Sequence, residues 1–370
     1  MINLDHAATT PLRQEAFDAM LPYFMEHAAN GNALYAEGRR ARAAIDAARR
    51  QIASAIHAQS AEVYFTGGGS EADNWALFGA MRAMSGKKHI VTTQIEHHAI
   101  LNACAALEKL GYEVTYVPVD RNGRVDPGAI ENAIRSETGM ISVMLANNEV
   151  GTIQPIAQIA HIAHAHGALM HTDAVQAVGH IPVHVEALGV DLLSLAAHKF
   201  YGPKGMGALY IRNGVRMTNL IYGGEQERGL RAGTENTPAI VGMGEALSLA
   251  CAELEQQAKR TQSLRDMLEG GIMRRFPNAI VNGDPENRLP GTLHVTFPGA
   301  DTNMLLMRLD MEGIAVSAGS ACAAGARERS HVIRAMHVPE GADVRFSLGR
   351  ENDETQIRQT IDALCRILNG

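Results

Sequence analysis

A lysine at the end of an apolar run is the residue whose position most clearly suggests chemistry. The run Asp191–Ala197 stops at His198 and Lys199, and a glycine-rich stretch follows. This pattern is typical of a buried strand that delivers Lys199 into a cleft. A poorly solvated ammonium group has a lowered pKa, and its free amine can form a Schiff base with a carbonyl cofactor. The alternative interpretation is a surface lysine that begins a loop.

A glycine turn between a strand and a helix predicts a site for an anion. Gly67–Gly69 follow the apolar run Val63–Phe65 and precede Ser70. Glycine amides and a helix N-terminus together bind phosphate, and the Ser70 hydroxyl can add a further hydrogen bond. The spacing is neither that of a Walker loop nor that of a GxGxxG loop, so a nucleotide phosphate is not indicated. The alternative is an ordinary turn with Ser70 as the helix N-cap.

Further polar residues follow other apolar runs of the chain. Asp173 ends one run, where its carboxylate could keep a pyridinium nitrogen protonated, although an ordinary N-cap would look the same. The segments Ile95–His98 and Asn147–Thr152 follow two more runs. Loops after successive strands of one parallel sheet meet in one crevice. Glycine turn, histidine, amide, carboxylate, glutamine and lysine, in this chain order, indicate pyridoxal 5′-phosphate (PLP) better than a nucleotide.

The elements that must position these residues form an α/β pattern. From about Arg13 to Arg212, short apolar runs alternate with helix-period segments, which predicts a mostly parallel sheet covered on both faces. A long helical pattern from Pro238 to about Phe276 then leads to a smaller α+β unit. We therefore expect a large PLP-binding domain at 13–250 and a small domain formed by 1–12 and 251–370. The seven strands expected in the large sheet are 63–65, 89–92, 113–119, 140–145, 168–171, 191–195 and 208–212.

Composition limits the class of protein. The chain has 370 residues, of which 46% are hydrophobic, and a net charge of -7, so no basic surface for nucleic acid is expected. The N-terminus has no signal-peptide pattern, and no apolar run reaches the about 18 residues that cross a bilayer. We therefore expect a cytoplasmic protein with no membrane contact. Four scattered cysteines without metal-ligand spacing indicate neither disulfides nor a metal site.

With these motifs in place, the chain resembles the cysteine desulfurases of the nitrogen-fixation and iron–sulfur-assembly type. These are PLP-dependent transferases of fold type I in the class V aminotransferase family. The resemblance implies an enzyme that acts on L-cysteine, forms a homodimer, and passes sulfur to an iron–sulfur scaffold or a sulfur-carrier protein. It runs nearly end to end, through the motifs Leu4–Pro11, Gly67–Asn74, Glu96–His97, Asn147–Gly151, His171–Asp173, Ala197–Gly205, Gln226–Pro238, Ser317–Cys322 and Val344–Gly349.

The resemblance implies roles around the PLP ring. Lys199 would hold the cofactor as a Schiff base and Asp173 would pair with the ring nitrogen. His97 would stack on the ring and share acid–base work with Lys199. Asn148 and Gln176 would bind near the ring oxygen.

It also implies roles at the phosphate and at the substrate. Arg345 would bind the substrate carboxylate, for which a bidentate guanidinium is suited, and Asn32 would assist. The phosphate would be held by Gly69, Ser70, His198 and, from a second subunit, Thr234.

Cys322 would be the nucleophile that takes the substrate sulfur as a persulfide. It lies among small residues at 317–325, which are too featureless to pack a core. A thiol with a pKa of about 8.5 is only slightly ionised at neutral pH, so a neighbouring group must raise its thiolate fraction. The same sulfur could bind an iron–sulfur cluster during transfer. The alternative is a free structural thiol.

Three positions depart from the family pattern. Gly67 stands where serine is common, and Ala196 stands where a phosphate-binding serine is expected. Loss of one hydrogen bond to a charged phosphate costs about 1.5–3 kcal/mol, so we expect weaker retention of PLP rather than its loss. The loop Gly31–Gly38 is shorter than its usual counterpart, which puts the substrate-side role of Asn32 in doubt.

Two alternative functions follow from these features. One is a cysteine or selenocysteine lyase, or a class V aminotransferase, that uses PLP without forming a persulfide. The other is a catalytically silent binding protein, which the substitutions at Gly67 and Ala196 would suit. The sequence identifies neither the physiological sulfur acceptor nor a preference between cysteine and selenocysteine.

Overall fold

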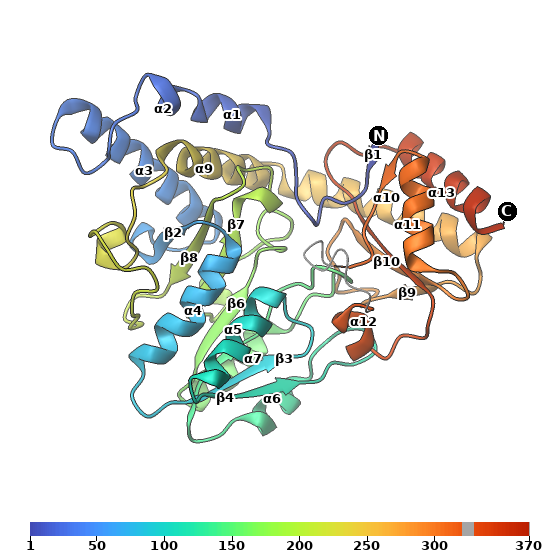
Figure 1. Cartoon of the computed structure of the whole chain (residues 1–370), viewed down its shortest axis with the longest axis horizontal. Coiled ribbons are helices and arrows are strands. Elements are labelled where there is room, and N and C mark those ends of the chain that lie inside the picture. Colours follow the sequence, from blue (N-terminus) through green and yellow to red (C-terminus); the bar gives the residue numbers. More distant parts are fainter. Residues whose placement is uncertain (320–328, 370) are drawn as a thin grey trace.

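A mixed seven-stranded sheet forms the centre of the larger unit of the molecule (Figure 1). The computed structural model describes residues 1–319 and 329–369. Only β8 runs antiparallel to its neighbours β2 and β7, so the expectation of a mostly parallel sheet is confirmed. In order across the sheet, the strands are β2 (Val63–Thr66), β8 (Gly207–Ile211), β7 (Leu192–Ala196), β6 (Leu169–Asp173), β5 (Thr138–Ser142), β3 (His89–Thr93) and β4 (Glu113–Val117).

Both faces of this sheet are apolar because helices cover both. Along β3, Ile90 points into one core and Val91 into the other, and Leu192 and Leu193 of β7 divide in the same way. This explains why the strands appear in the sequence as continuous apolar runs rather than alternating ones. One core contains α4 (Gly69–Ala83) and α5 (His98–Lys109). The other contains α3 (Ala36–Ala55), α6 (Pro127–Ala133), α7 (Ile156–Ala165), α8 (Val185–Leu188) and α9 (Thr237–Ala252).

Two expected strands extend more than one residue past the carboxyl end of the observed strand. The strand expected at 113–119 ends at Val117, because Pro118 has no N–H to donate to a neighbouring strand. The strand expected at 140–145 is assigned as β5 and ends at Ser142. Its backbone nevertheless continues to pair with β6, since the Leu145 N–H donates to the Asp173 carbonyl at 2.8 Å.

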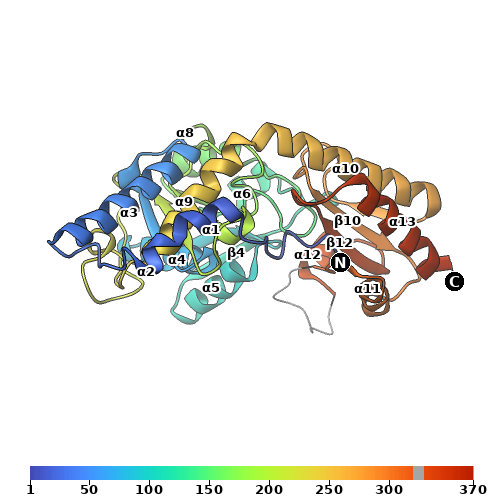
Figure 2. The ribbon, with the colours of Figure 1, turned by 90° about the horizontal axis from the view of Figure 1, so that it is seen from above.

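The smaller unit is built on a three-stranded antiparallel sheet with the order β12 (Ala342–Ser347), β10 (Thr292–Phe297), β9 (Ile280–Asn282). The long helix α10 (Leu254–Arg275) runs to it from the large unit (Figure 2) and packs with α13 (Glu354–Asn369) against its apolar face. Other elements are α1 (Gln14–Met20), α2 (Pro22–Met25), α11 (Thr302–Met311), α12 (His331–Ala335), β1 (Ile2–Asn3), β11 (Ile314–Ala315), and the 3-10 turns η1 (Ser60–Glu62), η2 (Ala197–Lys199) and η3 (Glu227–Gly229).

The N-terminus belongs to the smaller unit in space. β1 pairs in parallel with β11, and Leu4 is fully buried in the same core as α10 and α13. The chain then crosses to α1, which packs on α9 of the large unit. The domain boundaries at 12/13 and 250/251 stay a prediction. Among the described residues, no helix combines the length and apolar character needed to cross a bilayer.

A buried ion pair anchors the segment after β8. Arg49 of α3 donates to both carboxylate oxygens of Glu227, at 2.7 and 2.8 Å, and its side chain is only 8% exposed. Glu227 also accepts from the Phe65 N–H of β2 at 3.0 Å. Glu227 and Arg228 both have positive φ, at 48° and 59°, which is costly for residues with a Cβ. The ion pair therefore stabilises a turn that the local backbone disfavours.

We predict that Arg49→Ala lowers the free energy of unfolding by about 3–5 kcal/mol, because the buried Glu227 carboxylate loses its counter-charge. Urea unfolding followed by circular dichroism measures this change. The matched control is Arg135→Ala, whose ion pair with Glu113 is exposed on both sides. That control should change the free energy by less than about 1 kcal/mol. Equal effects of the two substitutions would contradict the prediction.

Candidate active site

A cavity of about 160 Å³ lies beyond the carboxyl ends of the parallel strands β6 and β7. β6 ends at Asp173, and β7 runs directly into η2, which carries His198 and Lys199. Strands that run in parallel end at the same edge of the sheet, which brings these side chains together. Of the twelve predicted site residues, nine line the cavity: Gly69, Ser70, His97, Asn148, Asp173, Gln176, His198, Lys199 and Arg345.

The Lys199 amine is held by the crossing segment that joins the two units. Its Nζ donates to the backbone carbonyl of Ala7 at 2.5 Å and to that of Ala8 at 2.9 Å. The side-chain amide of Gln176 donates to the same Ala7 carbonyl at 3.0 Å. These contacts place the half-buried amine at the wall of the cavity, where a carbonyl compound bound inside could reach it.

Asp173 provides a buried carboxylate in the same cavity. Burial raises its pKa to about 6, while the Val175 N–H, which donates to Oδ1 at 2.9 Å, and the charge of Lys199 act in the opposite direction. An acid that is costly to ionise favours a cation placed against it. The protonated ring nitrogen of PLP is such a cation, so Asp173 fits the predicted partner of the pyridine ring.

The histidines of the cavity are neutral at physiological pH. Burial, together with the charges of Lys199, His98 and His331, lowers the pKa of His97 to about 4. Its Nδ1 accepts from the Ala99 N–H at 3.2 Å as the N-cap of α5, which leaves the proton on Nε2. Burial also lowers the pKa of His198 to about 4. A neutral imidazole can lie against an aromatic ring without adding charge beside a protonated ring.

The glycine turn forms a cradle that a larger residue would fill. A Cβ on Gly69 would lie 2.8 Å from the Val175 side chain and 3.5 Å from that of Ala196. Gly68 has φ 149°, in the region that favours glycine. Gly69 begins the fifteen-residue helix α4, whose first N–H groups suit an anion. The backbone therefore approaches the cavity closely at the end predicted to hold the phosphate.

Arg345 carries a hydrogen-bond donor that has no acceptor in the described part of the chain. The side chain is 1% exposed, and it donates to the Asn148 carbonyl at 2.9 Å and to Asp5 Oδ1 at 2.7 Å. Its buried Nε has no hydrogen-bond partner among the residues at 1–319 and 329–369. Buried donors are normally paired, so this one indicates an acceptor supplied by a ligand, as a substrate carboxylate would be.

Asn32 and Thr234 lie outside the cavity of their own chain. Both are exposed, and they belong to one surface region because Arg42 donates to the Asn32 side chain and, at 2.8 Å, to Glu235. Cys322 lies outside the described residues. Five positions before it, Ser317 pairs through its backbone with Arg345, at 2.6 Å from the Arg345 N–H to the Ser317 carbonyl.

Two contributors to the cavity were missed from the sequence. The carbonyl groups of Ala7 and Ala8 carry no sequence signal, because every residue has such a group. Asp73 also lines the cavity and is 1% exposed, but an acidic residue three positions after a possible N-cap serine is common in an ordinary helix, so nothing in the sequence signalled a site there. Burial and the charge of Asp173 raise the pKa of Asp73 well above its ordinary value, which disfavours its ionised form.

The fold and the site define a PLP-dependent enzyme of fold type I, and the comparisons with known proteins agree. A family model, Aminotransferase class-V, matches residues 2–360. The cysteine desulfurase IscS of Dictyoglomus turgidum is 48% identical, with 99% of this chain and 94% of that protein covered. The IscS of Methanosarcina thermophila is 47% identical, with 99% and 92% covered.

Solved structures agree with these relatives. A NifS-like protein superposes with a TM-score of 0.94 at 37% identity and covers 100% of this chain and 99% of its own. A structure of SspA in complex with cysteine has a TM-score of 0.84 at 35% identity, with 94% and 99% covered. The chain belongs to the class V aminotransferase family and, within it, to the PLP-dependent cysteine desulfurases.

We predict that Ala196→Ser strengthens PLP binding. Ala196 lines the cavity beside Gly69, so a hydroxyl there adds a hydrogen bond to a charged phosphate. A gain of about 1.5–3 kcal/mol corresponds to a dissociation constant about 10- to 150-fold lower, measured by equilibrium titration of the apoenzyme. Ala197→Ser is the control, because Ala197 packs in the core rather than the cavity. An unchanged constant for Ala196→Ser would show that the phosphate lies elsewhere.

Proposed function

We propose that this chain converts L-cysteine to L-alanine and takes the released sulfur onto Cys322 as a persulfide. Two observations support the proposal. The relatives that match nearly the whole chain are cysteine desulfurases. In addition, Lys199, Asp173 and Arg345 line one cavity with an amine, a carboxylate and a guanidinium donor that the described residues leave without a partner.

The residues of the cavity fit PLP at each of its polar positions. Lys199 would bind the cofactor carbonyl, Asp173 would pair with the ring nitrogen, and His97 would lie against the ring. Gly69, Ser70 and His198 would hold the phosphate at the N-terminus of α4, while Asn148 and Gln176 would bind near the ring oxygen. Bound PLP supplies an electron sink for charge that develops at the Cα of the amino acid.

Arg345 and Lys199 divide the work on the substrate. Arg345 binds the carboxylate through its Nε, which orients the Cα proton. The amine of Lys199 removes that proton, and the Ala7 and Ala8 carbonyls, which accept from Nζ, hold the amine beside the cavity. Positioned acid–base groups of this kind contribute about 10² to 10⁴ in rate.

The sulfur step is a transfer between two thiols. The Cys322 thiolate attacks the substrate sulfur, so an S–S bond forms while the Cβ–S bond breaks. The electron pair of the broken bond stays with Cβ, which takes up a proton and becomes the methyl group of alanine. The products are L-alanine and the Cys322 persulfide, and no external oxidant or reductant is needed. The persulfide sulfur then passes to an acceptor thiol on an iron–sulfur scaffold or sulfur-carrier protein.

We also propose that the functional unit is a homodimer in which Thr234 completes the phosphate site of the partner. Thr234 and Asn32 occupy one exposed region outside their own cavity. Large exposed apolar side chains also occur on α1, on α2, at the residue between them and on the segment that contains Asn32, which is typical of an interface. They are Phe17, Leu21, Phe24, Met25, Leu34 and Tyr35. The cytoplasmic location stays a prediction.

We predict that Cys322→Ala retains PLP, as judged by its visible absorbance, but forms alanine from cysteine at least about 100-fold more slowly, because the sulfur acceptor is lost. Cys365→Ala removes another free thiol and is the matched control, with unchanged turnover. Full turnover by Cys322→Ala would favour a lyase that forms no persulfide. Absence of the absorbance from the wild-type protein would favour a silent binding protein.

A mixing experiment tests the role of Thr234. Thr234→Ala should raise the PLP dissociation constant about 10-fold or more, through loss of a hydrogen bond to a charged group. Heterodimers of Thr234→Ala and Lys199→Ala chains should regain one site of wild-type affinity, because the Lys199→Ala chain supplies Thr234 to the other chain's intact lysine. If Thr234 acts within its own chain, both sites of the heterodimer stay defective and no affinity is regained.

A further inference from the structure

One face of the small sheet is polar although it is buried. Residues directly opposite each other in β9, β10 and β12 share a face, and so do alternate residues of one strand. His294 lies opposite both Asn282 and Arg345, and Thr296 lies opposite Asp343. All five side chains belong to residues no more than 3% exposed. The intervening residues, such as Val295 and Val344, face the apolar core with α10 and α13.

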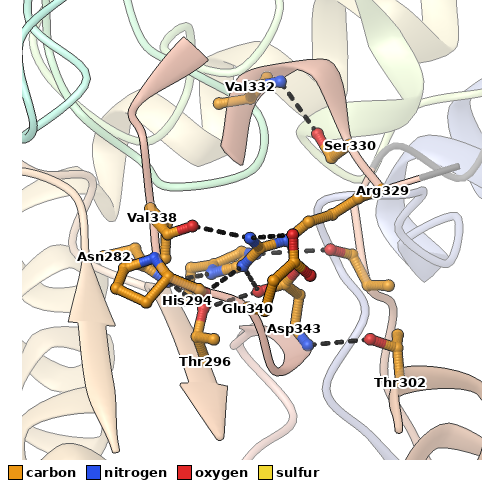
Figure 3. A network of polar contacts seen from close by, with 12 residues as sticks. Asn282, His294, Thr296, Thr302, Arg329, Ser330, Val332, Val338, Glu340 and Asp343 are labelled. Atoms are coloured by element: carbon orange, nitrogen blue, oxygen red, sulfur yellow. Dashed lines mark hydrogen bonds and ion pairs between the residues drawn. The ribbon is translucent and has the colours of Figure 1, made fainter. Parts of the chain in front are cut away.

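Hydrogen bonds connect four of these five residues, all except Arg345, into one network (Figure 3). The Asn282 amide donates to His294 Nδ1 at 2.9 Å and to Thr296 Oγ1 at 2.8 Å. Thr296 in turn donates to Asp343 Oδ1 at 2.6 Å. Because His294 Nδ1 accepts, its proton lies on Nε2, which contacts the Ala318 carbonyl at 3.4 Å. The chain from Ala318 to Arg329, called the Cys322 segment below, is therefore bound to β10 at its upstream end, Ala318.

Arg329 binds the downstream side of the same segment to β12. Its Nε donates to Asp343 Oδ2 at 2.6 Å, and Nη2 donates to Oδ1 at 2.9 Å (Figure 3). The guanidinium also donates to the carbonyl groups of Val338 and Pro339 at 2.7 and 2.9 Å. The Arg329 side chain is 16% exposed and that of Asp343 only 4%. A bidentate ion pair of this kind, largely shielded from water, is stronger and more directional than an ion pair on the surface.

Both contacts lie close to the residue predicted to bind the substrate. Asp343 and Arg345 are two positions apart on β12, and so lie on the same face. Ser317, one residue before Ala318, pairs with the backbone of Arg345 and donates from Oγ to Asp5 Oδ2 at 2.8 Å. Asp5 also accepts from the Arg345 guanidinium. The described residues on both sides of 320–328 are thus tied to one strand beside the cavity.

We propose that the Arg329–Asp343 pair is a positioning device for sulfur transfer, which fixes the downstream end of the Cys322 segment relative to Arg345. The proposal rests on the proposed role of Cys322 as sulfur acceptor. Neither Arg329 nor Asp343 lines the cavity, so the pair acts through the segment that it anchors. Misplacing a reacting group by about 1 Å can lower a rate about 100-fold, so loss of the anchor should slow the step that uses the thiol.

The test compares two reactions of the PLP-loaded enzyme. Alanine formation from L-cysteine needs Cys322. Elimination from 3-chloro-L-alanine, which with water gives pyruvate, ammonia and chloride, needs no sulfur acceptor. Arg329→Gln should lower kcat for cysteine about 10- to 100-fold with KM nearly unchanged, and leave the initial elimination rate within about twofold. Arg329→Lys keeps the positive charge but cannot make the bidentate pair, so its kcat for cysteine should fall less than that of Arg329→Gln.

Two further variants control for folding and for general effects on the small unit. The double variant Arg329→Gln, Asp343→Asn removes both charges, so no carboxylate is left buried and unpaired. If the single variant is unstable, the double variant replaces it in the comparison of the two reactions. Arg366→Gln breaks an exposed ion pair with Glu312 in the same unit and should change neither reaction. PLP absorbance and melting temperature establish that each variant is loaded and folded.

The outcomes separate this inference from the proposed function. Equal losses in both reactions would show a merely structural role for the pair, and unchanged cysteine turnover would show no role; either result overturns the inference. If Cys322→Ala abolishes cysteine turnover while the Arg329 variants are unaffected, the inference alone fails. If Cys322→Ala continues to form alanine, the proposed persulfide fails and the inference fails with it.

Discussion

The site depends on the two hydrogen bonds that the Lys199 amine donates to the carbonyl groups of Ala7 and Ala8. The lysine leaves the end of a strand in the large sheet, whereas the carbonyls belong to a segment that continues from the core of the small unit. This contact joins the two units across the cavity. It also holds the amine at a fixed place while leaving it accessible from the cavity, which is the condition for a reactive lysine.

Burial determines the charge state of the remaining groups. The same loss of water lowers the pKa of His97 and His198 and raises the pKa of Asp173 and Asp73. Histidines that stay neutral and carboxyl groups that are costly to ionise produce a cavity that favours a cation beside Asp173. A protonated pyridine ring is such a cation. A site with charged imidazoles would instead repel that ring. The cofactor class therefore follows from solvation as much as from the identity of the residues.

The two faces of the sheet in the small unit make different contacts. Its sheet has an apolar face that packs on α10 and α13 and a polar face that binds Ala318 and Arg329. Polar groups inside a protein are favourable only when their hydrogen bonds are made. The bidentate pair of Arg329 with Asp343 meets that condition. A buried network of this kind specifies one arrangement more strictly than an apolar contact, which suits the proposed role of the Arg329–Asp343 pair in positioning Cys322.

The sequence by itself determined the seven-stranded α/β architecture and most residues of the cavity, because strand ends, glycine turns and apolar periodicity are local signals. Lys199, Asp173 and Gly69 were found in this way, each at the end of a strand or at the start of a helix. Only the tertiary structure decided that Ala7 and Ala8 hold the lysine, that Asn32 lies outside the cavity of its own chain, and that Arg329 pairs with Asp343. These contacts join residues from separate elements, often far apart in the chain, and their geometry is decided by how elements pack rather than by any local pattern.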